Sequence, residues 1–331
     1  MNIRKSKANL PNPSTGEYET HHFETELAQI SDMAAFMRTL AAQGVSASKI
    51  RELLSAASTN AATTSSPGLL IAADKAKLDV IVDSAYAHNG IYRGKDLTSY
   101  FDSGEMTKAI SAGTFKDIYI GDYINKNITV DGTTYQVKWE VAHIDYFYKS
   151  GDTSCDAHHV VMFPSKTVRV NTPMNATNTT EGAYIGSNMW KTIIPLFNTG
   201  IEAAFGSAHV LSHRELLANA ISANAASAAG AGWTGSSTSW AWYDVKANIP
   251  SEPMIYGGTV FGSSGYDVGN AERQLAIFKF KKFSEGRLWF WLRAVASASG
   301  FCYADSGGYA SCNSASNSGY NGGCRPYFLL R

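Results

Sequence analysis

The chain ends in LWFWLRAVASASGFCYADSGGYASCNSASNSGYNGGCRPYFLLR, residues 288–331, and this stretch joins two kinds of sequence. Its two ends, 288–292 and 326–330, are dense in aromatic and branched residues, which favour buried strands. Between them, 21 of the 25 residues from 299 to 323 are Ser, Gly, Tyr, Ala or Asn. The sequence therefore predicts a polar segment held between two core strands.

This polar segment has the composition of a binding surface. Tyrosine offers a broad amphipathic contact with few rotatable bonds, and Ser, Gly and Asn adapt around it. The alternative is a low-complexity loop, which composition alone also allows. The regular placement of Tyr303, Tyr309 and Tyr320 between two strand candidates favours the binding surface.

Length and composition narrow the class of protein. The 331 residues leave room for two or three domains, and 44% apolar residues suffice for a sizeable core. Lys plus Arg and Asp plus Glu both number 28, so charge gives no reason to expect nucleic acid or an anionic membrane as partner. No apolar run approaches the roughly 20 residues that span a bilayer, and 1–20 has no signal-peptide core. We expect a chain that is made in the cytosol, or exported without a cleaved signal, and that does not insert into a membrane.

The four cysteines are Cys155, Cys302, Cys312 and Cys324. In a protein assembled in a reducing cytosol, free thiols are the expected state. A bridge within the end segment, with a further thiol pairing with Cys155 or staying free, remains open.

The first third of the chain is expected to anchor and oligomerise. Residues 1–22 are polar with two prolines and predict an extended arm. Residues 23–57 predict two short amphipathic helices, which either dock as a hairpin on the rest of the chain or bundle with copies of themselves. Residues 58–116 begin with a linker of small residues and are expected to form a stalk.

From residue 117 the pattern becomes mixed strand and helix. The segments 118–124 and 127–137 alternate apolar and polar residues, and Asp131-Gly132 predicts a hairpin turn between strands. Apolar periodicity predicts helices over 189–205, with Pro195 kinking the first, and over 212–225. Further strands are expected at 139–148, 160–163, 274–280 and 289–292, whereas 82–118 shows only turn residues and short apolar segments.

Several motifs resemble the C-type-lectin-like domains of phage-encoded proteins. They are Trp291-Leu292-Arg293, Phe301-Cys302-Tyr303, Arg325-Pro326, His143-Ile144-Asp145-Tyr146, Gly151-Asp152, His158-His159, Met174-Asn175 and residues 252–257. In addition, GLLIAADKAKLD at 68–79 resembles the GLMSAADKAKLD segment that leads into the trimeric stalk of phage fibres.

The resemblance implies an α+β protein, in which a short helical anchoring region precedes a lectin-like domain over 117–331 with twisted antiparallel sheets and two helices. It also implies a virion fibre or spike subunit, expected as a trimer, that attaches to other virion proteins through its N-terminal region. In this family the end segment faces the ligand, a host-surface glycan or protein. In many members, known as variable proteins, a diversity-generating retroelement mutates that segment at adenines.

The candidate ligand-binding residues follow from composition and from this resemblance. They are Tyr303, Asp305, Tyr309, Asn313, Asn317, Tyr320 and Asn321, with Trp233, Trp240 and Trp242 expected on a neighbouring rim. Trp291, Arg293, Arg325 and Pro326 are expected as scaffold beneath them. The two arginines are expected to hold the segment through bidentate bonds, and a surface position is the alternative.

Motifs for metal binding and catalysis are incomplete. A zinc site normally needs two spaced pairs of ligands, and a second pair is missing beside Cys155, His158 and His159, with His143 and Asp152. These residues are therefore expected to be scaffold. Glu252-Pro253 is followed by Met254, and no Trp-Asn-Asp triplet occurs, so the calcium site of sugar-binding lectins is not expected.

Cys302, Cys312 and Cys324 are spaced by ten and twelve residues, and they lack the sequence motif that surrounds the close cysteine pair of formylglycine-generating enzymes. His213 is expected to be a structural residue. We expect no metal, no cofactor and no catalytic residue.

Three hypotheses about function remain: a host-receptor adhesin, a capsid or tail decoration protein that adheres weakly to glycans, mucus or neighbouring subunits, and an enzyme acting on surface sugars.

Overall fold

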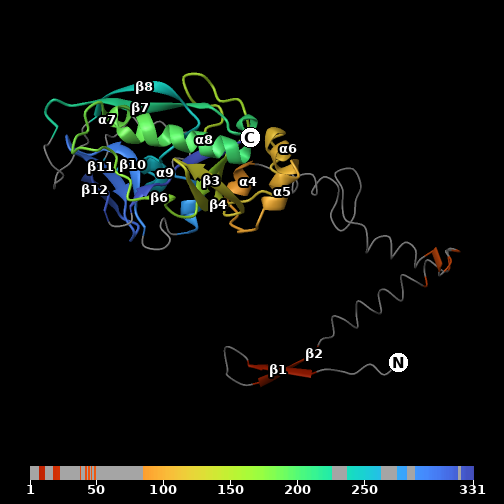
Figure 1. Cartoon of the computed structure of the whole chain (residues 1–331). Coiled ribbons are helices and arrows are strands. Elements are labelled where there is room, and N and C mark those ends of the chain that lie inside the picture. The colour runs from red at the N-terminus through yellow and green to blue at the C-terminus, as the bar shows by residue number, and fades with distance from the viewer. Residues whose placement is uncertain are drawn as a thin grey trace. The chain divides into compact units, whose positions relative to one another are not determined.

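The computed structural model describes residues 7–11, 18–22, a few single residues between 38 and 49, and 85–225, 237–261, 274–281, 288–319 and 322–331. The chain divides into two compact units, Met1–Asp79 and Val80–Arg331. In the first, β1 (Lys7–Pro11) pairs antiparallel with β2 (Tyr18–His22), so the expected arm contains a hairpin (Figure 1). The helices expected within 23–57 lie almost entirely outside the described residues, and the fibre-like motif at 68–79 lies wholly outside them.

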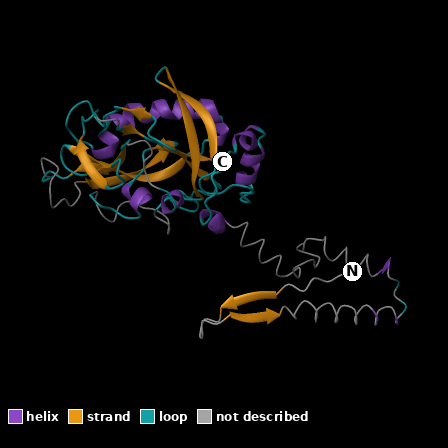
Figure 2. Cartoon of the chain, turned by 90° about the horizontal axis from the view of Figure 1, so that it is seen from below, coloured by secondary structure: helices purple, strands orange, loops and turns teal. Residues whose placement is uncertain are grey.

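The second unit is an α+β structure built on two five-stranded sheets (Figure 2). The strands of the first sheet, in spatial order, are β3 (Tyr123–Val130), β4 (Thr133–Ile144), β5 (Val160–Pro164), β14 (Tyr327–Leu330) and β9 (Ala247–Asn248). The strands of the second sheet are β12 (Ala310–Ser314), β11 (Gly300–Ala304), β10 (Phe290–Val295), β13 (Gly323–Cys324) and β6 (Arg169–Val170). The second sheet is mixed, rather than antiparallel as expected, because β10 and β13 run parallel.

The predicted Asp131-Gly132 turn is confirmed. It joins β3 to β4 with Val130 opposite Thr133, and both turn residues have positive φ, 51° and 74°. Positive φ at both central positions defines the turn whose twist matches that of the flanking strands.

The helix expected over 212–225 is wrong. This segment holds β7 (His213–Ile221), which pairs antiparallel with β8 (Ser237–Val245) in a separate two-stranded ribbon. Leu216, Leu217 and Ile221 have helical spacing, but burial alternates with period two: His213, Glu215 and Leu217 are buried and the residues between them are half-buried. Pairing with the aromatic β8 overrides the weak helical pattern.

The segment 82–118 also differs from expectation. It contains the short helices α4 (Ala85–Asn89), α5 (Thr98–Asp102) and α6 (Glu105–Ser111). They pack on the first sheet, where Leu97 N–H donates to the Tyr123 carbonyl over 2.7 Å. The compact unit therefore begins at Val80 and includes residues that were expected in the stalk.

Two further predictions concern helix and strand near the core. The helix expected over 189–205 is confirmed as a π-helical turn, Met189–Ile193, that continues into α8 (Ile194–Phe205). Ile194 N–H reaches back five residues to the Met189 carbonyl, and Pro195, which has no N–H to donate, follows directly. The strand expected at 274–280 is wrong, because Ala276–Lys279 forms a 3₁₀ helix.

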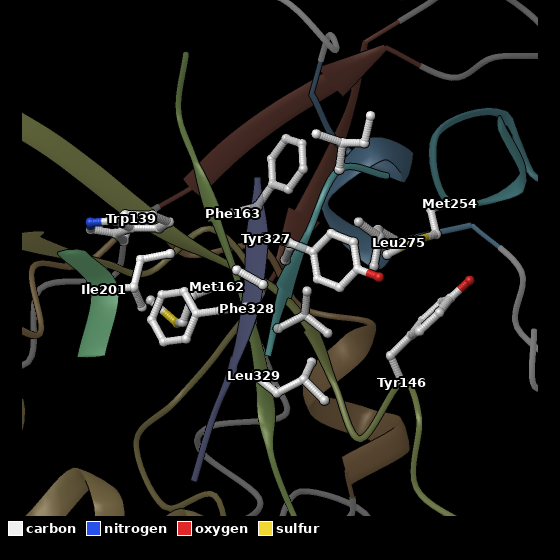
Figure 3. Packing of buried hydrophobic residues seen from close by; sticks show 14 of the residues in the cluster. Trp139, Tyr146, Met162, Phe163, Ile201, Met254, Leu275, Tyr327, Phe328 and Leu329 are labelled. Atoms are coloured by element: carbon white, nitrogen blue, oxygen red, sulfur yellow. The ribbon is translucent and has the colours of Figure 1, made fainter. Parts of the chain in front are cut away.

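The C-terminal strand lies in the middle of the core. All four residues of β14 are fully buried, and β14 pairs with β5 on one side and β9 on the other. Figure 3 shows Phe328 on the side of Trp139 and Ile201, and Tyr327 on the opposite side toward Leu275. The rings of Trp139 and Phe328 are 5.2 Å apart and nearly perpendicular. Because both faces of β14 are covered, this end of the polar segment is fixed to the core.

Candidate functional site

The polar segment forms a hairpin at one edge of the second sheet. In β11 and β12, Tyr303 lies opposite Ser311 and Phe301 lies opposite Asn313. Directly opposed residues share a face, and successive residues alternate between faces. Asp305, whose N–H donates to the Tyr309 carbonyl over 2.9 Å, continues the same alternation at the turn. Figure 1 shows β10, β11 and β12 together in blue at one end of the unit.

This register places four of the candidate residues on one face. We call Tyr303, Asp305, Tyr309, Ser311 and Asn313 the hairpin face, and Phe301, which shares this side of the hairpin, is fully buried. Tyr309 is 62% exposed, more than any other large apolar or aromatic residue on the described surface, whereas Tyr303 is only partly exposed. The hairpin face thus offers one exposed ring, Tyr309, and a second, partly exposed ring, Tyr303.

Two tryptophans, Trp289 just before β10 and Trp291 within it, flank Tyr303, and Trp291 lies opposite Tyr303 in the register, on the same face of the sheet. The Trp289 ring lies 4.8 Å from the Tyr303 ring and 4.9 Å from the Trp291 ring. Trp291 is fully buried, and its Nε1–H donates to the Thr172 carbonyl over 2.8 Å. Sequence reasoning predicted Trp291 as scaffold and missed Trp289, although the i, i+2 spacing in LWFW carries the signal.

Short local hydrogen bonds shape the hairpin turn and the segment beyond it. Asp305 Oδ1 accepts from Gly307 N–H over 2.7 Å, and Gly308 adopts a φ of 91°, which favours glycine. Asn317 Oδ1 accepts from Gly319 N–H over 2.9 Å. Asn313 Oδ1 accepts from the next residue, Ser314, over 2.8 Å. These bonds fix the local conformation around Asp305, Asn313 and Asn317.

The far end of the hairpin is tied to the segment after β6. Ala315 N–H donates both to the Ser299 carbonyl over 2.8 Å and to Asn178 Oδ1 over 3.1 Å. The Ala315 carbonyl accepts from Asn175 N–H over 2.9 Å. Ala315 itself is fully buried, so the strand end is fixed by main-chain contacts.

The remaining candidate binding residues do not join this face in the described part of the chain. Tyr320, Asn321 and Trp233 lie outside the described residues. Trp240 and Trp242 are half-buried residues of β8, opposite Ala218 and Leu216 of β7. They belong to the two-stranded ribbon rather than to the sheet that carries Tyr303.

Both scaffold arginines lie inside the unit, so the surface alternative does not hold. Arg325 is 1% exposed, and its Nε and Nη2 donate to the carbonyls of Pro164 and Ser165 over 2.9 and 2.8 Å. Its guanidinium also lies over the rings of Phe163 and Phe290 at 4.4 and 4.8 Å. Pro326, next to it, is buried. Arg325 therefore links the first sheet to β10.

Arg293 forms a buried ion pair with Glu215 of β7. Glu215 also accepts from the Tyr327 hydroxyl over 2.5 Å and contacts His213 Nε2 at 2.9 Å. Burial disfavours the charged carboxyl, but Arg293 and His213 outweigh burial and lower the pKa of Glu215 to about 2. This charged network ties the ribbon, β10 and β14 together.

The candidate metal ligands are engaged in structural contacts. His158 Nδ1 lies 2.7 Å from Asp145 Oδ2, and Asp152 forms a two-pronged pair with Arg214 at 2.8 Å. His159 Nε2 accepts from Phe147 N–H, and Cys155 Sγ lies 3.8 Å from the Ala157 carbonyl. His143 Nδ1 accepts from Ala276 N–H over 3.0 Å.

The carboxylate of Glu252 has a similar structural role. Its oxygens accept from the N–H groups of Val260 and Phe261 over 3.0 and 3.1 Å. Across the described ranges, no group of three or more His, Cys, Asp or Glu side chains could hold a metal ion.

A groove of about 370 Å³ lies at the β6 edge of the second sheet, the edge opposite the hairpin. It is bounded by the start of β4 and by residues 165–170, and Tyr135, Lys138 and Val170 are among its lining residues. Val170, on edge strand β6, is 40% exposed.

Comparison of the chain with protein families found no matching family, and comparison with curated proteins and with solved structures found no match either. Among the helices that the structure describes, none has the length and apolar character needed to cross a membrane.

Proposed function

We propose that the chain is a virion fibre or spike subunit whose second unit, a C-type-lectin-like domain, binds a glycan or protein on the host surface. Binding is non-covalent and uses the hairpin face. The observation that carries this proposal is the register of β11 and β12, which gathers Tyr303, Asp305, Tyr309 and Asn313 on one face. A linker would not be expected to have this arrangement.

The physical basis of recognition is a polar, aromatic face on a rigid support. Tyr309 supplies an exposed ring with few rotatable bonds, Asp305 supplies a carboxylate opposite it, and Asn313 supplies an amide further along the same face. The contact of Tyr303 with Trp289 and the local bonds of the turn reduce the entropy lost on binding. Several copies on one oligomer would add avidity to weak single sites.

In this proposal the first unit anchors and oligomerises, as the fibre-like motif at 68–79 suggests. The end segment is diversified between related viral genomes, because its Asn, Ser, Tyr and Gly content is that of adenine-directed mutation. A repeat of the gene's end that differs at adenines supports this. Unchanged codons across many isolates without such a repeat refute it.

Competition for host attachment tests the role. Purified full-length protein, added to host cells before the virus, is expected to reduce adsorption, and labelled antibody is expected at the tail tip. Undiminished adsorption together with antibody on the capsid would replace the adhesin with a decoration protein. Release of sugar products from host envelope glycans would replace it with an enzyme.

A further inference from the structure

Two cysteines face each other across the hairpin. Cys302 of β11 lies directly opposite Cys312 of β12. The pair Asp305–Tyr309 is joined by a main-chain hydrogen bond, and so is the pair Ser299–Ala315 in the same register. Hydrogen-bonded and non-hydrogen-bonded pairs alternate along an antiparallel ladder. Since Cys302 lies an odd number of residues from both Asp305 and Ser299, its pair with Cys312 is non-hydrogen-bonded.

This kind of pair suits a disulfide. Opposed residues at non-hydrogen-bonded positions have Cα atoms about 4.5 Å apart, with their side chains on the same face. Disulfides span Cα separations of roughly 4.4–6.8 Å. The backbone therefore needs little movement to close a bridge between Cys302 and Cys312.

The surroundings of the two thiols agree with the register. Burial raises the pKa of Cys302 well above its usual range, and the charges of Glu252 and Cys312 add to this effect. Burial also raises the pKa of Cys312 to about 11, again with a contribution from Glu252. One carboxylate, at the start of α9 (Glu252–Tyr256), therefore acts on both thiols, which lie together on the face opposite the hairpin face.

Both thiols are free in this structure, as are Cys155 and Cys324. We propose that Cys302 and Cys312 are a disulfide-forming pair that closes after the protein leaves the reducing cytosol and locks the hairpin in its binding conformation. The location outside the cell rests on the proposed function, whereas the ability to form the bridge does not.

The reaction is thiol–disulfide exchange with a small-molecule disulfide such as oxidised glutathione. The thiolate of Cys312, the half-exposed partner, attacks one sulfur and releases one glutathione thiolate. The thiolate of Cys302 then attacks the Cys312 sulfur of this mixed disulfide and releases the second. The two cysteines lose two electrons and two protons, glutathione disulfide gains the electrons, and the protons pass to the glutathione thiolates or to solvent. The raised pKa values make the first step slow, which keeps the thiols reduced during assembly.

The bridge is detected by disulfide mapping of the full-length protein. After incubation with oxidised glutathione, the remaining thiols are alkylated in denaturant, and the digest is analysed by mass spectrometry. We expect one peptide pair joined through Cys302 and Cys312, with Cys155 and Cys324 alkylated. Alkylation of all four cysteines after oxidation, or a bridge between another pair, would overturn the proposal.

The locking role is tested by thermal unfolding. Closing a short loop is expected to raise the melting temperature of the oxidised protein by about 5–10 °C over the reduced protein. Cys312→Ser should abolish both the bridge and this difference, whereas the control Cys155→Ser should retain them. A bridge that leaves the melting temperature unchanged would refute the locking role. Host-cell binding is measured separately, so loss of binding with an intact bridge would count only against the proposed function.

Discussion

The ring of Tyr303 lies 4.8 Å from the ring of Trp289, and this contact joins the hairpin face to the core. Trp289 is only 6% exposed, while Tyr303 opposite Ser311 is partly exposed. Tyr303 therefore packs against Trp289 while part of its side chain stays exposed. Tyr309, at the turn, has no such inward packing among the ring contacts of the described residues.

The two tyrosines should separate stability from binding. We expect Tyr303→Ala to lower the free energy of unfolding by about 1–3 kcal/mol, because it removes a half-buried ring from the tryptophans. Tyr309→Ala should change it by less than about 0.5 kcal/mol, because the ring is 62% exposed. Urea unfolding of both variants checks this. Equal destabilisation by the two changes would contradict the described packing.

Gly322 is expected to be irreplaceable beneath Trp289. A Cβ atom at this position would overlap the indole ring. Gly322→Ala should therefore displace Trp289 and cost about 1–3 kcal/mol of stability, as overpacking does. Gly258→Ala is the matched control, because a Cβ atom there would meet nothing within 4 Å beyond its neighbours in the chain. Near-UV circular dichroism should report the displaced tryptophan in the first variant alone; an unchanged spectrum would disprove the contact.

The ion pair of Glu215 and Arg293 should be costly to break from one side. Glu215→Gln leaves the Arg293 charge buried without its counter-charge, which is expected to destabilise the unit by about 3–5 kcal/mol. Asp152→Asn removes one of the two carboxylates that pair with Arg214 near the surface, so it should destabilise the unit far less than Glu215→Gln. Chemical denaturation compares the two. A small effect of Glu215→Gln would show that the buried network is not required.

Acid should weaken the second unit below about pH 6.5. Burial lowers the pKa of His159 from 6.5 to about 3, and the pKa of His143 likewise. The unfolded chain therefore binds protons that the folded unit does not, so stability falls as the pH drops from 6.5 toward 3. The slope should reach about 1.4 kcal/mol per pH unit for each histidine. In His159→Gln one of these contributions should disappear from denaturation curves taken between pH 7 and 4, and an unchanged slope would contradict the neutral, buried state.

Prediction from sequence succeeded where local signals and burial agree. Asp131-Gly132 specified its turn, and the all-apolar Tyr327–Leu330 specified a strand covered on both faces. It failed at His213–Ile221, where leucines at helical spacing concealed a strand whose burial alternates, and at 85–111, where the helices are too short to show periodicity.

The candidate site was predictable in composition but not in geometry. The bias toward Tyr, Ser, Asn and Gly identified the segment, but only the register shows that Tyr303 and Asn313 share a face while Cys302 and Cys312 share the other. The buried partner of Arg293 lies 78 residues away in sequence, so no local pattern could have indicated Glu215.

The most direct test of the account is binding of the purified full-length protein to host cells, compared with Tyr309→Ala and Val170→Ala. Both positions are exposed and lie at opposite edges of the same sheet, so both variants should fold equally well. We predict saturable binding that Tyr309→Ala weakens at least about tenfold, as loss of a hot-spot aromatic does, and that Val170→Ala leaves unchanged. Binding that is insensitive to Tyr309→Ala, or lost equally in both variants, would contradict recognition through the hairpin face.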